Sequence, residues 1–169
     1  QFGYDAQGNL TGRTDSNAKT TAYQYDVLNR MTKITYPDST TVTYTLDAVG
    51  NITKLQDATG ATTYSFDKVN RLKTCAYPDA VMLSYAYDTN GNRTSLDMTA
   101  FGKTVYEYNN LNRLTKITAP DGKITQFAYD KISRRTQLNY PNGAAAVYGY
   151  DKAGRLIQLI NKDKSSVEI

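Results

Sequence analysis

The sequence predicts an all-β protein: a repeat array of β-hairpins, with about two antiparallel strands in each 21-residue unit, forming a curved sheet strip. Three observations predict it. An aromatic residue or Leu followed by Asp or Asn recurs in register, and turn residues punctuate each unit twice. Between the turns, Thr, Tyr, Val and Ile are abundant, as in strands. No window has the 3.6-residue period of an amphipathic helix.

The first element of each unit is the aromatic-Asp pair. Consecutive copies are 21 residues apart, except for one step of 20 between Leu46 and Phe66. The eight copies are Tyr4-Asp5, Tyr25-Asp26, Leu46-Asp47, Phe66-Asp67, Tyr87-Asp88, Tyr108-Asn109, Tyr129-Asp130 and Tyr150-Asp151. This spacing predicts eight tandem units over residues 2–168 as one array without separate domains, with both ends of the chain falling in mid-repeat.

The second element is a hairpin loop that begins at the Asp. Four residues after each aromatic or Leu position come Gly8, Asn29, Gly50, Asn70, Gly91, Asn112, Ser133 and Gly154. Gly and Asn enter the left-handed backbone region most cheaply, and a type I turn followed by a G1 bulge requires such a residue. The Asp can accept N–H bonds across the turn. We therefore expect Asp5, Asp26, Asp47, Asp67, Asp88, Asp130 and Asp151 to cap their own loops.

The third element is a second turn in the middle of the unit. Four units carry Tyr36-Pro37-Asp38-Ser39, Tyr77-Pro78-Asp79-Ala80, Ala119-Pro120-Asp121-Gly122 and Tyr140-Pro141-Asn142-Gly143. Proline presets φ at the first central position of a turn. A longer period is superimposed: Gly-Asn units (Gly8, Gly50, Gly91) with a Pro-free turn alternate with Asn-Arg units (Asn29, Asn70, Asn112) with the Pro turn. Ser133-Arg134 breaks the alternation.

The strand entering each aromatic-Asp turn carries aromatic residues two apart, which places them on one face. They are Tyr23 with Tyr25, Tyr64 with Phe66, Tyr85 with Tyr87, Tyr106 with Tyr108, Phe127 with Tyr129, and Tyr148 with Tyr150. Stacked over the units, these residues are expected to form an aromatic ladder and the main cohesive element.

The returning strand carries apolar residues three apart, such as Met31 and Ile34 or Leu114 and Ile117. Residues three apart on a strand lie on opposite faces unless a bulge intervenes. Either both faces of the sheet are partly covered, or the strand kinks, and the pattern leaves both open.

Composition excludes several classes of function. The chain has no His, one Cys and a formal net charge of +4. It has no Ser-His-Asp set, no phosphate loop and no Cys-based metal cluster. We expect no enzymatic activity, cofactor or metal, and no nucleic-acid partner, because the hairpins already account for the Tyr residues. No apolar run approaches the ~20 residues of a membrane span. Cys75 takes an apolar strand position and is expected to be a small buried hydrophobe.

The residues Y-D-x-x-G/N-N/R-L-T-x-I-x-x-P-D-G resemble the YD-repeat, or RHS-repeat, family over essentially the whole chain. This family includes Rhs polymorphic toxins, the C components of Tc toxins, wall-associated proteins and teneurins. The resemblance implies a hollow shell of hairpins, which in bacterial members encloses a C-terminal toxin and in teneurins is a scaffold for adhesion. The self-cleaving D-P-x-G-L region of toxin members has no match here.

The resemblance thus implies a non-catalytic segment of such a shell, secreted or at the cell surface as part of a larger protein. Its expected partners are the rest of its own shell and an enclosed toxin segment, and its cut edges predict self-association. The alternative is a module that binds carbohydrate or another polyanion. For that alternative the densest basic patch, Lys131, Arg134 and Arg135, supplies the candidate contacts.

Overall fold

The computed structural model describes residues 1–165 and 167, which form strands and turns and no helix. The strands are β1 (Phe2–Tyr4), β2 (Leu10–Thr14), β3 (Thr20–Tyr25), β4 (Met31–Thr35), β5 (Thr41–Leu46), β6 (Ile52–Asp57), β7 (Gly60–Phe66), β8 (Leu72–Ala76), β9 (Met82–Tyr87), β10 (Arg93–Met98), β11 (Gly102–Tyr108), β12 (Leu114–Thr118), β13 (Ile124–Tyr129), β14 (Arg135–Asn139), β15 (Ala145–Tyr150) and β16 (Leu156–Lys162).

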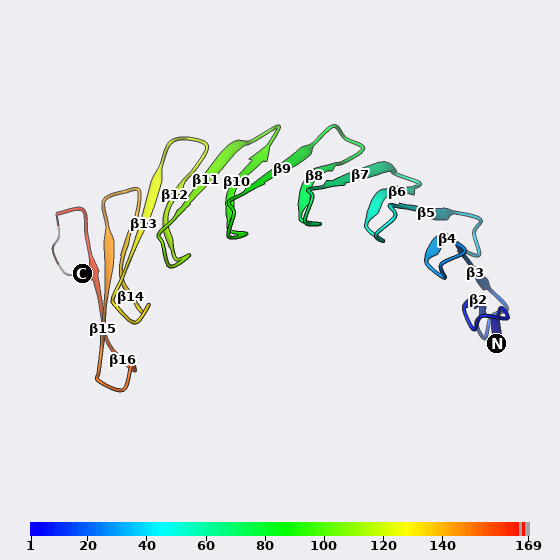
Figure 1. The fold of residues 1–169 in the computed structure, drawn as a ribbon, viewed down its shortest axis with the longest axis horizontal. Helices are drawn as coiled ribbons and strands as arrows, with labels where there is room; N and C mark the ends of the chain where they lie inside the picture. The colour runs from blue at the N-terminus through cyan, green and yellow to red at the C-terminus, as the bar shows by residue number, and fades with distance from the viewer. Residues whose placement is uncertain (166, 168–169) are drawn as a thin grey trace. The chain divides into compact units, whose positions relative to one another are not determined.

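Neighbours in the sheet are neighbours in the chain, and the strands labelled in Figure 1 follow one another in chain order within each part of the chain. The all-β hairpin array predicted from the sequence is confirmed. The chain divides into two compact units at Leu83. In the first unit, β1 to β8 pair antiparallel in sequence, and in the second unit β10 to β16 do the same.

The strand register makes the sheet amphipathic. Tyr23 lies opposite Ile34, and Ile34 lies opposite Val42. The other face of the same strands carries polar residues, because Lys33 lies opposite Gln24 on one side and Thr43 on the other. A single sheet layer with one apolar face follows from this alternation.

A β-bulge in each hairpin explains the apolar residues three apart. Tyr23 pairs with Ile34 and Tyr25 with Met31, so Thr32 is an extra residue in β4. The bulge returns Met31 to the face that carries Ile34 and the tyrosines. The same register shift occurs between β11 and β12, where Tyr106 pairs with Ile117 and Tyr108 with Leu114. Of the two explanations that the sequence left open, the kinked strand is therefore the correct one.

The sheet has almost no enclosed core. Among the described residues, Cys75 and Ala146 are the only buried apolar side chains, at 4% and 2% exposure, and Thr62 and Ser95 are the buried polar ones. No large side chain of the described residues is fully buried. The expectation that Cys75 is a buried strand residue is confirmed. Cohesion must come from bonds between neighbouring hairpins, as in other repeat arrays.

Candidate functional site: the row of aromatic-Asp turns

Each aromatic-Asp turn is a type I turn closed by a left-handed residue. In the turn of residues 26–30, the N–H of Asn29 donates to the main-chain oxygen of Asp26 at 3.0 Å, and the N–H of Asp26 donates to that of Arg30 at 2.9 Å. Asn29 has φ 59°. Positive φ recurs at the equivalent residues, which are Gly8, Gly50, Asn70, Gly91, Asn112, Ser133 and Gly154.

The Asp carboxylate organises this loop from within. Oδ1 of Asp26 accepts the N–H groups of Leu28 at 2.9 Å and Arg30 at 3.0 Å, and Oδ2 accepts Nε of Arg30 at 2.7 Å. The pKa of Asp26 lies below its usual 3.8, chiefly because the main-chain N–H of Arg30 donates to its carboxylate. In the Gly-Asn turns the pKa of the Asp is lowered chiefly by a side-chain amide; for Asp5 this is the amide of Asn9.

The fourth residue after the Asp defines two kinds of turn. Where it is Arg, Nε donates to the Asp at 2.6 to 2.7 Å; the pairs are Arg30–Asp26, Arg71–Asp67, Arg134–Asp130 and Arg155–Asp151. Where it is Asn, Nδ2 donates to the Asp at 2.8 to 2.9 Å; the pairs are Asn9–Asp5, Asn51–Asp47 and Asn92–Asp88.

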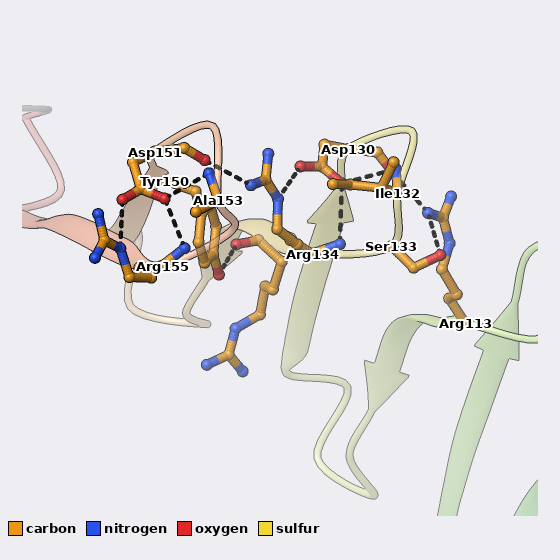
Figure 2. Close-up of polar contacts among 10 residues, drawn as sticks. Arg113, Asp130, Ile132, Ser133, Arg134, Tyr150, Asp151, Ala153 and Arg155 are labelled. Carbon is orange, nitrogen blue, oxygen red and sulfur yellow. Dashed lines mark hydrogen bonds and ion pairs between the residues drawn. The ribbon is translucent and has the colours of Figure 1, made fainter.

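The same fourth residue joins its turn to the next one along the sheet. Nη1 of Arg30 donates to the main-chain oxygen of Asp47 at 2.7 Å, and Nη1 of Arg113 to that of Asp130 at 2.8 Å. Figure 2 shows Arg134 placed in this way between Asp130 and Asp151, with Nη1 3.2 Å from the oxygen of Asp151. We call the space between two consecutive turns a junction, and one bridged by Arg an Arg junction.

In an Asn junction the bridge is shorter and ends on a side chain. Nδ2 of Asn9 donates to Oδ1 of Asn29 at 2.8 Å, and Nδ2 of Asn92 to Oδ1 of Asn112 at 2.9 Å. Asn51 makes the same bond to Asn70 at 3.2 Å.

This difference explains the alternation seen in the sequence. An Asn bridge requires an Asn at the left-handed position of the next turn, so a Gly-Asn turn is followed by an Asn-Arg turn. An Arg bridge uses a main-chain oxygen, so the next left-handed residue is free to be Gly50, Gly154 or Ser133. Ser133, which follows the Arg113 bridge, breaks the alternation without losing a contact.

In four junctions the tyrosine of the second turn lies in the floor. The backbone ladder between β2 and β3 ends at Gly12 and Ala22, and beyond it the hydroxyl of Tyr25 donates to the main-chain oxygen of Leu10 at 3.0 Å. The equivalent bonds run from Tyr108 to Arg93, Tyr129 to Leu114 and Tyr150 to Arg135, at 2.8 to 3.1 Å. The ring thus replaces ladder hydrogen bonds where the strands separate.

In two Arg junctions the guanidinium covers that ring. The central carbon of Arg113 lies 5.0 Å from the ring centroid of Tyr129, and that of Arg134 lies 4.6 Å from the centroid of Tyr150. These distances are those of cation–π contacts.

Two Asn junctions instead contain a cavity. The first, about 610 Å³, is lined by Asp5, Asn9, Tyr25, Asp26 and Asn29 among others. The second, about 440 Å³, is lined by the equivalent residues Asp88, Tyr108, Asn109 and Asn112, together with Glu107. Amide and carboxylate groups surround a tyrosine in both.

The basic patch named from the sequence is divided between different surroundings. Lys131 is exposed in its turn. Arg134 is half-buried and bonded to Asp130 and Asp151 as described above. Arg135 lies on the apolar face with its guanidinium 4.6 Å from the ring centroid of Tyr148.

The aromatic residues named from the sequence lie on the apolar face, half-buried. They are Tyr23, Tyr25, Tyr64, Phe66, Tyr85, Tyr87, Tyr106, Tyr108, Tyr129, Tyr148 and Tyr150. The strand beside each inner ring contributes a smaller residue: Ile34 faces Tyr23, Cys75 faces Tyr64, and Leu159 faces Tyr148. Rings and non-aromatic side chains therefore alternate across the sheet.

Sequence reasoning missed the residues that join the turns, namely Asn9, Asn51, Asn92, Arg30 and Arg113. The signal was present in the alternation of Gly-Asn with Asn-Arg. Within the described part of the chain, no group of three His, Cys, Asp or Glu is placed to hold a metal ion. That same part contains no helix long and apolar enough to cross a membrane.

Comparison with family models gives two matches. The RHS Repeat model matches residues 4–41 and 32–62. The Teneurin YD-shell model matches residues 55–168, about two thirds of the chain. No curated protein matches the chain.

Solved structures of Tc toxin components share the fold. The Photorhabdus luminescens Tc holotoxin pore with a TccC3 mutation matches with a TM-score of 0.59 and 20% identity, over 98% of this chain and 9% of that one. TcdB2-TccC3 without its hypervariable C-terminal region matches with a TM-score of 0.63 and 16% identity, over 99% of this chain and 12% of that one. The chain thus spans about a tenth of the length of these relatives.

Proposed function

This chain belongs to the teneurin YD-shell family, and from that premise we propose that it is a non-catalytic segment of the wall of a YD-repeat shell. The shell, secreted or at the cell surface, encloses a C-terminal toxin or scaffolds a cell-surface protein. One observation carries the proposal: successive hairpins are held to each other by repeated turn-to-turn bonds, while the layer itself encloses almost no core. Such a layer is suited to be a wall.

The electrostatics of the turns support a non-catalytic role. A general acid near neutral pH needs a carboxyl group with a raised pKa. The hydrogen bonds in these turns lower the pKa instead, and Asp5, Asp26 and Asp47 share that direction. Their carboxylates are occupied by the loop that they organise.

We propose further hairpins of the same kind as partners at the outer edge of β16. The side chain of Arg155 is 81% exposed, whereas that of its equivalent Arg134 is 27% exposed and bridges to the next turn. Leu156 and Leu159 are also more than half exposed. A following aromatic-Asp turn would cover all three residues. In the isolated chain this edge predicts self-association.

The wall role is tested by placing residues 2–168 into a TcdB2-TccC3 shell in place of the hairpins that they match. We expect the chimaera to protect the C-terminal region of TccC3 from added protease as the parent does. A matched chimaera carrying Asp26→Lys, Asp67→Lys and Asp130→Lys, which removes three loop carboxylates, should lose that protection. A folded chimaera with a protease-sensitive C-terminal region would contradict the proposal.

A further inference from the structure

The two kinds of junction are the same site in two states of filling. In the Arg134 junction three groups surround the guanidinium: the Asp carboxylate of its own turn, the main-chain oxygen of the next Asp, and the tyrosine ring below. Arg134 shows all three, with Asp130 at 2.6 Å, Asp151 at 3.2 Å and the centroid of Tyr150 at 4.6 Å. In the Asn9 junction the equivalent carboxylate, oxygen and ring are present, and two shorter side chains, Asn9 and Asn29, meet between them.

The first Asn junction presents these three groups around its cavity. Asp5 has the carboxylate, Asp26 the main-chain oxygen and Tyr25 the ring, and these three residues are among those that line the 610 Å³ space. Asn9 occupies only the position that Nε of Arg takes, since Nδ2 of Asn9 lies 2.9 Å from Oδ2 of Asp5. The same Nδ2 donates to Oδ1 of Asn29 at 2.8 Å, and the cavity lies beside this pair of amides.

The main-chain oxygen in this junction has the capacity to accept a second donor. In the Arg30 junction the oxygen of Asp47 accepts both the N–H of Gly50 at 3.2 Å and Nη1 of Arg30 at 2.7 Å. The oxygen of Asp26 accepts the N–H of Asn29 at 3.0 Å. A carbonyl oxygen has two lone pairs. The main-chain oxygen of Asp26 therefore has a second lone pair, equivalent to the one on Asp47 that accepts from Arg30.

The charge of the first Asn junction favours a cation. Asp26 is paired with Arg30. The described residues bring amide donors to Asp5, from Gln7 and Asn9, and no Lys or Arg within ion-pair distance. The pKa of Asp5 is lowered, so this carboxylate is ionised at neutral pH.

The second Asn junction, in the other unit of the chain, has a similar floor and one more amide, because Nδ2 of both Asn90 and Asn92 donates to Oδ1 of Asn112 at 2.9 Å. Tyr108 forms the floor, with its hydroxyl 3.1 Å from the main-chain oxygen of Arg93, and Asp88 and Asn109 take the places of Asp5 and Asp26. Glu107 adds a second carboxylate to the lining of this cavity.

We propose that the Asn junctions at Asn9 and Asn92 are binding sites for a guanidinium group supplied from outside the chain. The internal Arg134 junction is the template for the ligand. A planar fork of N–H donors matches one carboxylate and one carbonyl oxygen, and its face lies on a tyrosine ring. A Lys ammonium has neither the planar fork nor the stacking face. This site is independent of the wall role.

The test is a titration of the ¹⁵N-labelled chain with N-acetyl-L-arginine methylamide, followed by NMR. We expect saturable shifts of the side-chain amides of Asn9, Asn29 and Asn92, with a dissociation constant on the order of millimolar, as for a small ligand with few contacts. N-acetyl-L-lysine methylamide should bind at least several-fold more weakly. Absence of a saturable response, or equal responses to the two compounds, overturns the proposal.

Asn9→Arg is the decisive variant, because it fills the first junction from within, as Arg30 fills the next one. It should abolish the response of the first site and leave the response at Asn92. Asn17→Arg makes the same change of charge in an exposed turn at the other edge of the hairpins and should leave both responses. Continued binding at the first site in Asn9→Arg would overturn the assignment.

The reciprocal variant Arg134→Asn empties an Arg junction, because Gly154 of the next turn has no side chain for the shorter Asn to bond. We expect guanidinium chloride at low millimolar concentration to raise its Tm relative to equal sodium chloride, and to raise it by more than in the parent chain. A lack of rescue would contradict the template. Free L-arginine and the peptide acetyl-Gly-Arg-Gly-amide distinguish the two sources: tighter binding of the peptide assigns the site to a polypeptide partner, and tighter binding of the amino acid to a free metabolite.

Discussion

Arg113 donates its main-chain N–H to Oδ1 of Asn109 at 3.2 Å, while the buried Nε of the same arginine has no acceptor among the described residues. In the equivalent turns this Nε bonds an Asp, as Arg30 does to Asp26. Residue 109 is the one aromatic-Asp position occupied by Asn. Its only side-chain oxygen, Oδ1, already accepts the N–H groups of Leu111 and Arg113. Where an Asp has a second oxygen, Asn109 has an amide nitrogen, which donates and cannot accept from Nε.

Asn109→Asp should therefore stabilise the protein. The substitution supplies the acceptor that the buried Nε lacks, and satisfying such a donor is worth about 1 kcal/mol. Urea unfolding would measure the change. Asn110→Asp, an exposed neighbour that adds the same charge, is the matched control. Equal effects of the two substitutions would show that Arg113 is not the partner.

A second relationship joins the turns at the opposite edge of the hairpins. A Cβ placed on Gly60 would lie 2.6 Å from Cβ of Pro78, and one placed on Gly102 would lie 3.0 Å from Cβ of Pro120. Each Gly of a Pro-free turn thus leaves room for the proline of the next turn. The alternation of Pro-free and Pro turns has the same kind of cause as the alternation of Asn and Arg.

Gly60→Ala is expected to destabilise the protein by about 2 to 3 kcal/mol, through the contact with Pro78 and a φ of 132° that L-residues rarely adopt. Gly50→Ala isolates the cost of φ, since a Cβ on Gly50 meets nothing within 4 Å. We expect Gly60→Ala to cost more than Gly50→Ala, and Pro78→Ala to recover part of the difference. Thermal unfolding of Gly60→Ala, Gly50→Ala, Pro78→Ala and the double variant Gly60→Ala with Pro78→Ala would measure this coupling.

The fold could be predicted because its determinants are local. Asn29 and Gly50 show where the chain must enter the left-handed region, and Tyr23 with Tyr25 shows which face is apolar. The bulge was harder to predict. Met31 and Ile34 are three residues apart, and this spacing is consistent either with a kinked strand or with apolar residues on both faces of the sheet. Only the pairing of Tyr25 with Met31 separates these explanations.

The junctions could not be predicted, because they depend on contacts 17 to 20 residues apart. Within its own turn, Arg30 is a residue at the exposed edge of a hairpin. Its second bond, to Asp47, exists only because the sheet places one turn beside the next. The chemistry of a junction therefore arises from the distance between hairpins, which no single repeat encodes.

Stability should depend on pH through the turn carboxylates. The folded pKa of Asp26 lies below the ordinary 3.8, chiefly through the N–H of Arg30. A lowered folded pKa gives stability that is fully present above the unfolded pKa and is lost as pH falls through the folded pKa. Asp26→Asn should thus destabilise the protein at pH 7, and the difference from the parent should shrink below pH 3.8.

Urea unfolding of both proteins at pH 7 and pH 2 would measure that difference. Lys68→Gln, an exposed change of one charge in another turn, reports general charge repulsion in acid. A difference between Asp26→Asn and the parent that is the same at both pH values would exclude the linkage to the carboxylate.

The tyrosine hydroxyls can be tested by removal and by addition, because the ring at the Phe66 junction has no hydroxyl. Tyr25→Phe removes the bond to the oxygen of Leu10 and should cost about 0.5 to 1.5 kcal/mol. Phe66 holds the equivalent position beyond the end of the ladder between β6 and β7, where Lys54 and Thr63 form the last pair before the turn. Phe66→Tyr should therefore gain a bond to the main-chain oxygen of Ile52 and raise the free energy of unfolding. Tyr23→Phe is the control, because it removes a hydroxyl from the same strand and face as Tyr25. If Tyr23→Phe lowered the free energy of unfolding as much as Tyr25→Phe, the bond to Leu10 would not explain the loss.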